Sequence, residues 1–302
     1  MSAASPFAIV AVALAGAALL GLLEQLIAER RFAPAALVGR AASTLRQPLA
    51  MPDVKDAWLY HGAPALLLLG AILALAMVPW APGFRGLDFG TGAILYSAAL
   101  AYVTPAVFMA GWGSGRPLQV VGGFRFIALM LAFEMPLVMA VTAVGAPAES
   151  LRPSAIVEAQ HTVPLALSQP LAFALFVPAI MAVAFVPPFD LPQAEGELGG
   201  GAFSSYTGMH AAVVALAQRV LLLGAAGMTS ALFLGGWNGP LLPPAVWMAV
   251  KTLAVAAAML AAGRMVPRAR IDRLLPFAWK VAIPLAIVAI AWSGLVTLFF
   301  YR

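Results

Sequence analysis

The stretch VVGGFRFIALMLAFEMPLVMAVTAVGA, residues 120–146, carries a single carboxylate, Glu134, inside a long apolar run. A membrane-spanning helix needs about 20 mostly apolar residues, so this stretch predicts a helix that crosses a bilayer. The rest of the chain has the same character: 63% of its residues are hydrophobic, 10% are charged and the mean hydropathy is +0.96. These values exclude a soluble globular domain and predict an integral membrane protein.

Further windows of similar length and composition predict an all-α fold with eight transmembrane helices, arranged as a single polytopic domain over residues 1–302. The first run has no positive charge before it and charged residues directly after it, so we expect a retained anchor rather than a cleaved signal. No repeat relates the two halves, which argues against an inverted-repeat transporter. The eight windows are 5–27, 61–82, 88–112, 120–146, 169–187, 210–236, 244–266 and 277–300.

Basic residues gather in the loops that follow odd-numbered helices. By the positive-inside rule these loops are cytoplasmic and both termini lie outside, in the inner cell membrane. The formal net charge of +5 is therefore assigned to lipid headgroups and water, and nucleic acid is not expected as a partner. The odd loops hold Arg30, Arg31, Arg40, Arg46, Lys55, Arg116, Arg264, Arg268, Arg270 and Arg273, and the even loops hold Arg85 and Arg152.

Chemistry carried by this chain alone has no support in its motifs. The chain has no cysteine, so it cannot ligate an iron–sulfur cluster through thiolates, and we expect any redox cofactor to belong to a partner. Its three histidines have no metal-ligand spacing, and no nucleophile elbow or phosphate loop is present. We expect no catalytic residue and no metal site.

Glu134 is the most informative charged residue at membrane depth. Such groups cost roughly 2.5–3.5 kcal/mol each on insertion scales, so each is a functional candidate. Apolar neighbours predict a buried carboxyl with a raised pKa, suited to a proton relay. The alternative is a structural ion pair with Arg125 or with a cation on another helix. The other candidates are Glu24, Arg219, Lys251 and Lys280, of which Glu24 and the two lysines also fit positions near span ends.

Two polar segments interrupt the apolar pattern on the predicted cytoplasmic side. Residues 29–58 are expected to contain an amphipathic interfacial helix. The acidic block, PFDLPQAEGELGGGAFSSYTGM at 188–209, holds Asp190, Glu195 and Glu197 without a cation. Its prolines predict a rigid entry, and its glycines predict that any helix ends after Leu198. We expect a shaped re-entrant or interfacial segment rather than a solvated loop.

Several motifs, in order, resemble the quinone-site membrane subunit of respiratory complex I, which is called the H subunit in bacteria and subunit 1 in mitochondria. They cover about residues 111–287 and are specific in combination. The motifs are GWGSGRPLQVVGGFRFIALMLAFEMPL, PFDLPQAEGEL, SSYTGM, ALFLGGWNGP and RMVPRARIDRLLPFAWKVAIPLAI.

The resemblance implies a protein at the junction between a membrane arm and a cytoplasmic redox arm. It implies a quinone chamber at the interface, with iron–sulfur clusters and flavin in partner subunits. Those partners would be a cytoplasmic iron–sulfur subunit, a large subunit and antiporter-like membrane subunits. Residue by residue, it implies a relay or chamber role for Arg125, Glu134, Asp190, Glu195 and Glu197.

A second family segment, which lines the access route for quinone, is similar only in part to GRAASTLRQPLAMPDVKD at residues 39–56. Arg46, Gln47, Asp53 and Lys55 are the residues here that the resemblance implies for a quinone chamber or for arm docking.

Other positions depart from the family pattern. Gln193 replaces a glutamate, Phe203 and Ser205 replace a histidine and a glutamate, and Phe185 and Val186 replace an Asn-Arg pair. These losses fit the related membrane subunit of group 4 energy-converting nickel–iron hydrogenases, such as hydrogenase 4, formate hydrogenlyase and Ech complexes. That alternative needs no quinone chamber and places a nickel–iron centre in a partner. A stand-alone secondary transporter is a remote alternative.

Overall fold

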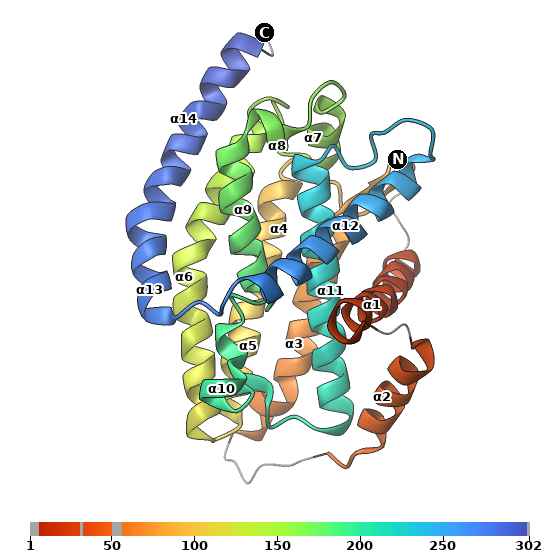
Figure 1. The fold of residues 1–302 in the computed structure, drawn as a ribbon, viewed down its shortest axis with the longest axis vertical. Coiled ribbons are helices and arrows are strands. Elements are labelled where there is room, and N and C mark those ends of the chain that lie inside the picture. The colour runs from red at the N-terminus through yellow and green to blue at the C-terminus, as the bar shows by residue number, and fades with distance from the viewer. Residues whose placement is uncertain (1–5, 31–32, 50–55, 301–302) are drawn as a thin grey trace.

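Long apolar helices dominate the computed structural model, which describes residues 6–30, 33–49 and 56–300 (Figure 1). The α-helices are α1 (Pro6–Glu29), α2 (Pro34–Arg46), α3 (Ala57–Ala76), α4 (Gly92–Ala101), α5 (Val103–Gly113), α6 (Pro117–Gly145), α7 (Pro153–Ala159), α8 (Leu165–Ser168), α9 (Pro170–Val183), α10 (Glu195–Leu198), α11 (Gly208–Phe233), α12 (Pro244–Met265), α13 (Ile271–Phe277) and α14 (Ile283–Phe300). Short 3-10 helices cover Leu191–Gln193 and Gly201–Phe203, and a π-helical turn covers Ala278–Ala282. A two-stranded antiparallel hairpin pairs β1 (Pro79–Ala81) with β2 (Phe84–Arg85).

Seven helices within the described ranges are long and apolar enough to cross a membrane. This confirms the all-helical membrane class, and the ends differ from the predicted windows by up to about a turn and a half. The seven spans are Pro6–Ala28, Ala57–Ala76, Gly92–Gly113, Pro117–Gly145, Gly208–Phe233, Pro244–Met265 and Ile271–Phe299.

The window at 169–187 yields a shorter helix than predicted. Helix α9 begins at Pro170 and ends at Val183, so it has 14 residues. Phe185 has a positive φ of 57°, and Pro187 and Pro188 follow it, so the helix cannot continue through its apolar sequence.

The centre of the bundle is formed by α3 and α11, with α5, α6 and α9 beside them, while α1, α12 and α14 lie toward the outside (Figure 1). Along the C-terminal half of α11 every residue from Val220 to Phe233 is buried. Lipid does not drive apolar helices together as water does, so close packing between small residues takes over, which suits an Ala- and Gly-rich chain. The largest side chains with almost no exposure are Tyr60, Tyr96, Phe126, Phe176 and Phe233.

Polar segments lie at the two ends of the bundle. Helices α2 and α10 occupy the lower part of Figure 1, near the start of α3, α6 and α11, whereas α7 and α8 lie at the upper end. At that upper end Arg85 donates a hydrogen bond to Glu158 at 2.9 Å, and Ser154 donates one to Asp88 at 2.6 Å. Because α10 belongs to the acidic block and α2 to the polar segment at 29–58, these two segments lie at the same, lower end of the bundle.

Candidate functional site

The acidic block is packed against the bundle rather than spread in solvent. Leu191, Pro192, Ala194 and Leu198 are buried along it. This agrees with a shaped segment and contradicts a plain solvated loop. Helix α10 ends at Leu198 as expected, because Gly199, Gly200 and Gly201 follow with φ of 57°, 94° and 60°.

Two glycines permit close backbone contacts here, Gly122 between α6 and the acidic block and Gly201 within the block. A Cβ on Gly201 would come within 1.7 Å of the Pro192 carbonyl oxygen, and one on Gly122 would come within 2.8 Å of the same atom. A side chain at Gly122 would push the block away from the helix, whereas one at Gly201 would clash within the block itself. The block is thus held at backbone contact with α6.

Asp190 ties the acidic block to the loop between α12 and α13. Its carboxylate lies 2.8 Å from Arg268, and its side chain is only 7% exposed. The same two segments share a backbone hydrogen bond, in which the Ala269 N–H donates to the Pro188 carbonyl at 3.0 Å. We call these two contacts the Asp190 latch. They join two segments that are separated in the sequence by α10, α11 and α12.

Arg125 and Glu197 form a second tie between α6 and the block. Their guanidinium nitrogen and carboxylate oxygen lie 2.6 Å apart, and Glu197 is 59% exposed. The alternative pairing of Arg125 with Glu134 is wrong, because nine residues of helix separate the two by about 14 Å along α6. For Glu195 the structure describes the backbone, in α10, but not the side chain.

Glu134 does not lie where its sequence neighbours predicted. It is exposed on the outer surface of α6, whereas Phe133 and Pro136 beside it are buried. Helix α6 is apolar on every face, so its sequence carries no signal for which face points inward. On its inner side Glu134 borders a crevice of about 10 Å³, room for about one water, whose lining includes Ser97 and Thr104.

Paired tyrosines close the end of the acidic block onto α3. The Tyr60 hydroxyl donates to the Ser205 carbonyl at 2.9 Å, and the Tyr206 hydroxyl donates to the Tyr60 carbonyl at 2.8 Å. The two rings stack with centroids 4.4 Å apart. Beside them, His61 and His210 share a hydrogen bond of 3.3 Å between α3 and α11. This tyrosine clamp fixes the segment that leads into α11.

Tyr206 gives the clamp a dependence on pH. Burial raises the pKa of its phenol above the ordinary value of 10.0, and the nearby Tyr60 acts in the same direction. Above about pH 10 the unfolded chain therefore loses a proton that the folded protein keeps. The contribution is complete below that pH and disappears as pH rises further. We expect the free energy of unfolding to fall there by up to about 1.4 kcal/mol per pH unit, measured by thermal unfolding in detergent.

A Tyr206→Phe variant should lose this part of the alkaline slope, although it should be less stable at neutral pH because a buried hydrogen bond is gone. Tyr102→Phe, at a residue that is 49% exposed, is the matched control. An unchanged alkaline slope in Tyr206→Phe would remove Tyr206 from this role.

Aromatic rings occupy the space beyond the clamp. The Phe203 ring meets Phe185 edge to face at 5.7 Å, and Phe185 stacks on Phe126 at 5.1 Å. Phe185 and Phe203 are two of the positions where the family pattern has polar groups. Aromatic packing therefore fills the space beside this part of the acidic block.

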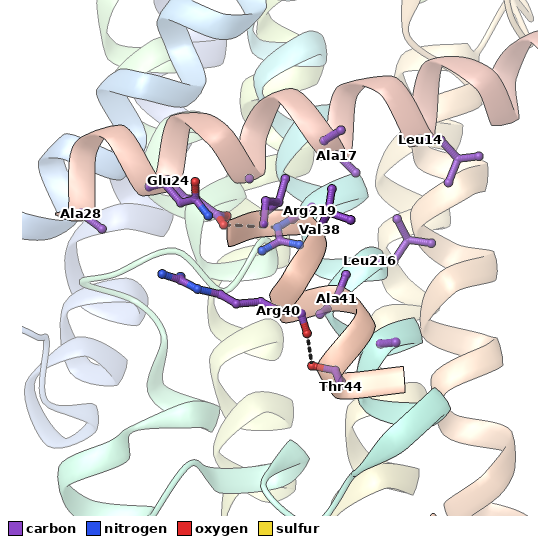
Figure 2. A pocket seen from close by; sticks show the side chains of 16 residues that line it. Leu14, Ala17, Glu24, Ala28, Val38, Arg40, Ala41, Thr44, Leu216 and Arg219 are labelled. Atoms are coloured by element: carbon purple, nitrogen blue, oxygen red, sulfur yellow. Dashed lines mark hydrogen bonds and ion pairs between the residues drawn. The ribbon is translucent and has the colours of Figure 1, made fainter. Parts of the chain in front are cut away.

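A cavity of about 620 Å³ opens between α1, α2 and α11. Figure 2 shows Glu24 on α1 and Arg219 on α11 turned toward each other, with Arg40 reaching along the same space from α2. Most of the remaining wall is apolar. The lining residues are Leu14, Ala17, Ala18, Gly21, Glu24, Gln25, Ala28, Leu37, Val38, Arg40, Ala41, Thr44, Ala212, Ala215, Leu216 and Arg219.

The ion pair of Glu24 and Arg219 stands between this cavity and a smaller one. Their charged atoms lie 3.2 Å apart, and about a third of each side chain is exposed. Both residues also line the second cavity, of about 230 Å³, whose far wall includes Phe185 and Val186. The two spaces therefore meet at one pair of opposite charges and end near the acidic block.

Gln25 adds an unsatisfied amide to the cavity wall. Its side chain is 4% exposed, and neither its nitrogen nor its oxygen has a hydrogen-bond partner among the described residues. A buried amide without partners costs about 1–3 kcal/mol. Both amide atoms are buried behind the cavity wall, so the side chain would have to turn before a ligand in the cavity could reach them.

The chain matches the family described as NADH dehydrogenase over residues 41–294. An H subunit of NADH-quinone oxidoreductase from Syntrophobacter fumaroxidans, the one numbered 2, is 36% identical over 253 residues, 81% of this chain and 76% of the relative. The H subunit of the same enzyme from Geobacillus kaustophilus is 37% identical over 255 residues, 83% and 77% of the two chains. The chain belongs to this H-subunit family.

A solved structure supports the fold of this member of the H-subunit family. A chain of the membrane-bound sulfane sulfur reductase, an archaeal respiratory membrane complex, superposes with a TM-score of 0.82. The alignment covers 95% of this chain and 97% of that one, at 23% identity. Family membership together with the apolar helices makes the chain a multi-pass membrane protein.

Of the residues that the family resemblance implied for the quinone chamber, Arg46 and Gln47 do not line the cavity. Arg46 is exposed at the last turn of α2, and Gln47 follows the helix with its backbone against Gly208. Asp53 and Lys55 lie outside the described residues. Thr207 donates to the Pro48 carbonyl at 2.7 Å, which ties this segment to the end of the acidic block.

Gln25, Arg40 and Thr44 are cavity residues that the sequence did not single out for this site. The sequence marks Glu24 and Arg219 as charges at membrane depth, but not as partners. Opposite charges in two predicted spans are a weak signal for such a pair. Nothing in the sequence indicates that Gln25 is buried without a partner.

Proposed function

We propose that this chain is the membrane subunit of a complex-I-like NADH-quinone oxidoreductase. It anchors the cytoplasmic redox arm, contributes to the quinone chamber and couples redox chemistry to proton or ion translocation. The observation that carries the proposal is the 620 Å³ cavity that leads, past the Glu24–Arg219 pair, toward the acidic block. Relatives with about 36% identity that are named as H subunits of NADH-quinone oxidoreductase support the same function.

The cavity has the chemistry that an isoprenoid quinone requires. Its apolar wall, which includes Leu14, Leu37 and Leu216, suits the tail. The Arg219 guanidinium is a donor for a quinone carbonyl oxygen, which only accepts hydrogen bonds. The chain supplies positions and donors, while iron–sulfur clusters and flavin in partner subunits supply the electrons.

We propose that the proton relay uses carboxylates at two places, in the acidic block and farther along α6. Asp190 and Glu197 lie at the junction, each against an arginine, and Glu195 belongs to the same segment. Glu134 lies about 26 Å along α6 from its start, where a carboxylate facing lipid would be costly. We infer that a helix of a partner membrane subunit covers Glu134. The crevice between Glu134 and Ser97 has room for about one water, which could accept or donate a proton there.

We propose that α9 is the eighth span and that both termini lie outside in the cytoplasmic membrane. Fourteen helical residues cover about 21 Å, and α8 directly before them lengthens the apolar segment. The acidic block contacts the segment after α2, the N-terminal half of α6 and the α12–α13 loop. Basic and acidic odd loops thus meet at one end, where the redox arm would dock.

Filling the cavity tests the quinone assignment. Replacing Ala41, exposed on the cavity side of α2, by Trp should lower quinone reduction by the assembled complex at least about tenfold, because the ring occupies the space. NADH oxidation with a soluble electron acceptor should be unchanged. Ser43→Trp is the control, since Ser43 is exposed on the same helix and does not line the cavity.

Full quinone reduction in Ala41→Trp would refute the cavity as the quinone site. A hydrogenase-type membrane subunit is the second candidate, because Phe185 and Phe203 put aromatic packing where the family has polar groups. Purification of the tagged chain separates the two: partners that bind NADH support the first, and a nickel-binding large subunit supports the second.

A further inference from the structure

A group of arginines gathers between α12 and α13, away from the cavity described above. Arg264, Arg268, Arg270 and Arg273 lie within ten residues of sequence, and Asp272 is the one acidic residue among them, so four positive charges less one negative give +3. A pocket of about 410 Å³ opens here. Its lining is Arg268, Ala269, Arg270, Arg273, Leu274 and Phe277.

The charge of this pocket is only partly compensated. Arg268 is held by Asp190 at 2.8 Å. Arg270 lies 3.6 Å from Asp272, but both side chains are more than 70% exposed, so this pair contributes little. Arg273 is exposed and makes no side-chain ion pair or hydrogen bond within the described residues. Two guanidinium groups are therefore available to an anion.

The pocket lies where two membrane-spanning helices meet the surface. Helix α12 ends at Met265, and the segment that ends in α14 begins at Ile271. Large apolar side chains around the loop are exposed: Met265 is 84% exposed, Trp279 56% and Phe277 50%. Tryptophan is enriched at the boundary between lipid tails and headgroups, which places the arginines at headgroup level.

We propose that this pocket binds the phosphate of an anionic membrane phospholipid. Arg270 and Arg273 present forked donors that match phosphate oxygens, and Leu274 and Phe277 give the adjoining apolar wall for the glycerol and first acyl carbons. Basic pockets between helices on the cytoplasmic side are suited to such lipids. An acidic partner protein would not need an apolar wall at membrane depth.

The site has a structural consequence for the junction. Arg268 forms both the edge of this pocket and one half of the Asp190 latch. A bound phosphate would hold the loop and would reduce repulsion among its arginines, so the acidic block would be kept in place. Anionic lipid should therefore stabilise the assembled complex as well as bind to it.

The test uses the purified complex, stripped of lipid in detergent and returned to nanodiscs of phosphatidylcholine with or without phosphatidylglycerol. We expect phosphatidylglycerol to raise the Tm of the wild-type complex and to be retained at this chain in native mass spectrometry. In Arg270→Gln/Arg273→Gln, apparent lipid affinity should fall about tenfold or more, since each Arg–phosphate contact is charge-assisted. Arg116→Gln, which removes an exposed cation that does not line the pocket, should match wild type.

Further measurements distinguish a membrane phospholipid from a free phosphate as the bound anion. Soluble glycerophosphate or inorganic phosphate that reproduced the full Tm shift would overturn the lipid assignment in favour of a free anion. Equal lipid dependence in wild type and in the double variant would also overturn it, as would an acidic protein that co-purifies with wild type and is lost from the variant. A double variant that cannot assemble is replaced by Arg273→Gln alone, for which a weaker lipid response is expected.

Discussion

Replacing Glu134 by Gln should abolish proton translocation while the complex remains assembled. Gln keeps the size and hydrogen-bonding capacity of the side chain but cannot take up and release a proton. Because Glu134 is exposed on α6 rather than packed within this chain, the substitution should not disturb the bundle. We expect protons translocated per electron pair to fall at least about tenfold, as an obligatory carrier at membrane depth requires.

The measurement is proton uptake by proteoliposomes during NADH-driven quinone reduction. Glu134→Asp should retain much of the activity, because a carboxyl remains at the position. Glu149→Gln, a change in the loop after α6, should pump as wild type does. Undiminished pumping by Glu134→Gln would exclude Glu134 from the relay.

Replacing Arg268 by Ala should release the acidic block from the α12–α13 loop. The change leaves the buried Asp190 carboxylate without its arginine, and loss of one partner of a buried ion pair costs up to about 3–5 kcal/mol. Arg268 is 45% exposed, so we expect about half of that cost. The redox arm should dissociate more readily, and quinone reduction should fall about tenfold.

A double-mutant cycle isolates the Asp190 latch. Asp190→Asn/Arg268→Ala should be more stable than Arg268→Ala alone, because the buried charge is then removed, with a coupling of about 1–3 kcal/mol measured by thermal unfolding. Arg268→Lys should restore part of the stability. Additive effects of the two substitutions would mean that the latch does not hold the junction.

The fold class could be predicted because lipid imposes a simple rule on sequence. Long apolar runs, basic odd loops and the breaks at Pro188, Pro192 and Gly199 are local features, and most helices lie where these features indicate. The boundaries of α9 were less predictable. The sequence stays apolar after the helix ends at Val183, and the end is visible only in the structure, as the positive φ of Phe185.

The sequence identified charged residues of the candidate site, such as Asp190 and Glu24, but not the partners that they contact. Asp190 and Glu197 were identified as junction carboxylates, yet the arginine that each contacts comes from a distant segment. The cavity was not predicted at all. Its walls come from α1, α2 and α11, and its central ion pair joins residues 195 positions apart.

By itself the sequence determined a multi-pass helical protein of the complex I H-subunit family with an acidic, proline-bounded block. Only the tertiary structure decided that Glu134 points outward, that Arg125 contacts Glu197, and that Glu24 and Arg219 meet between two cavities. The physical reason is that these helices are apolar on every face. Their composition specifies that they span the membrane, but not which face of each helix points into the bundle. Charges in such helices are paired by packing, and packing is a property of the assembled bundle.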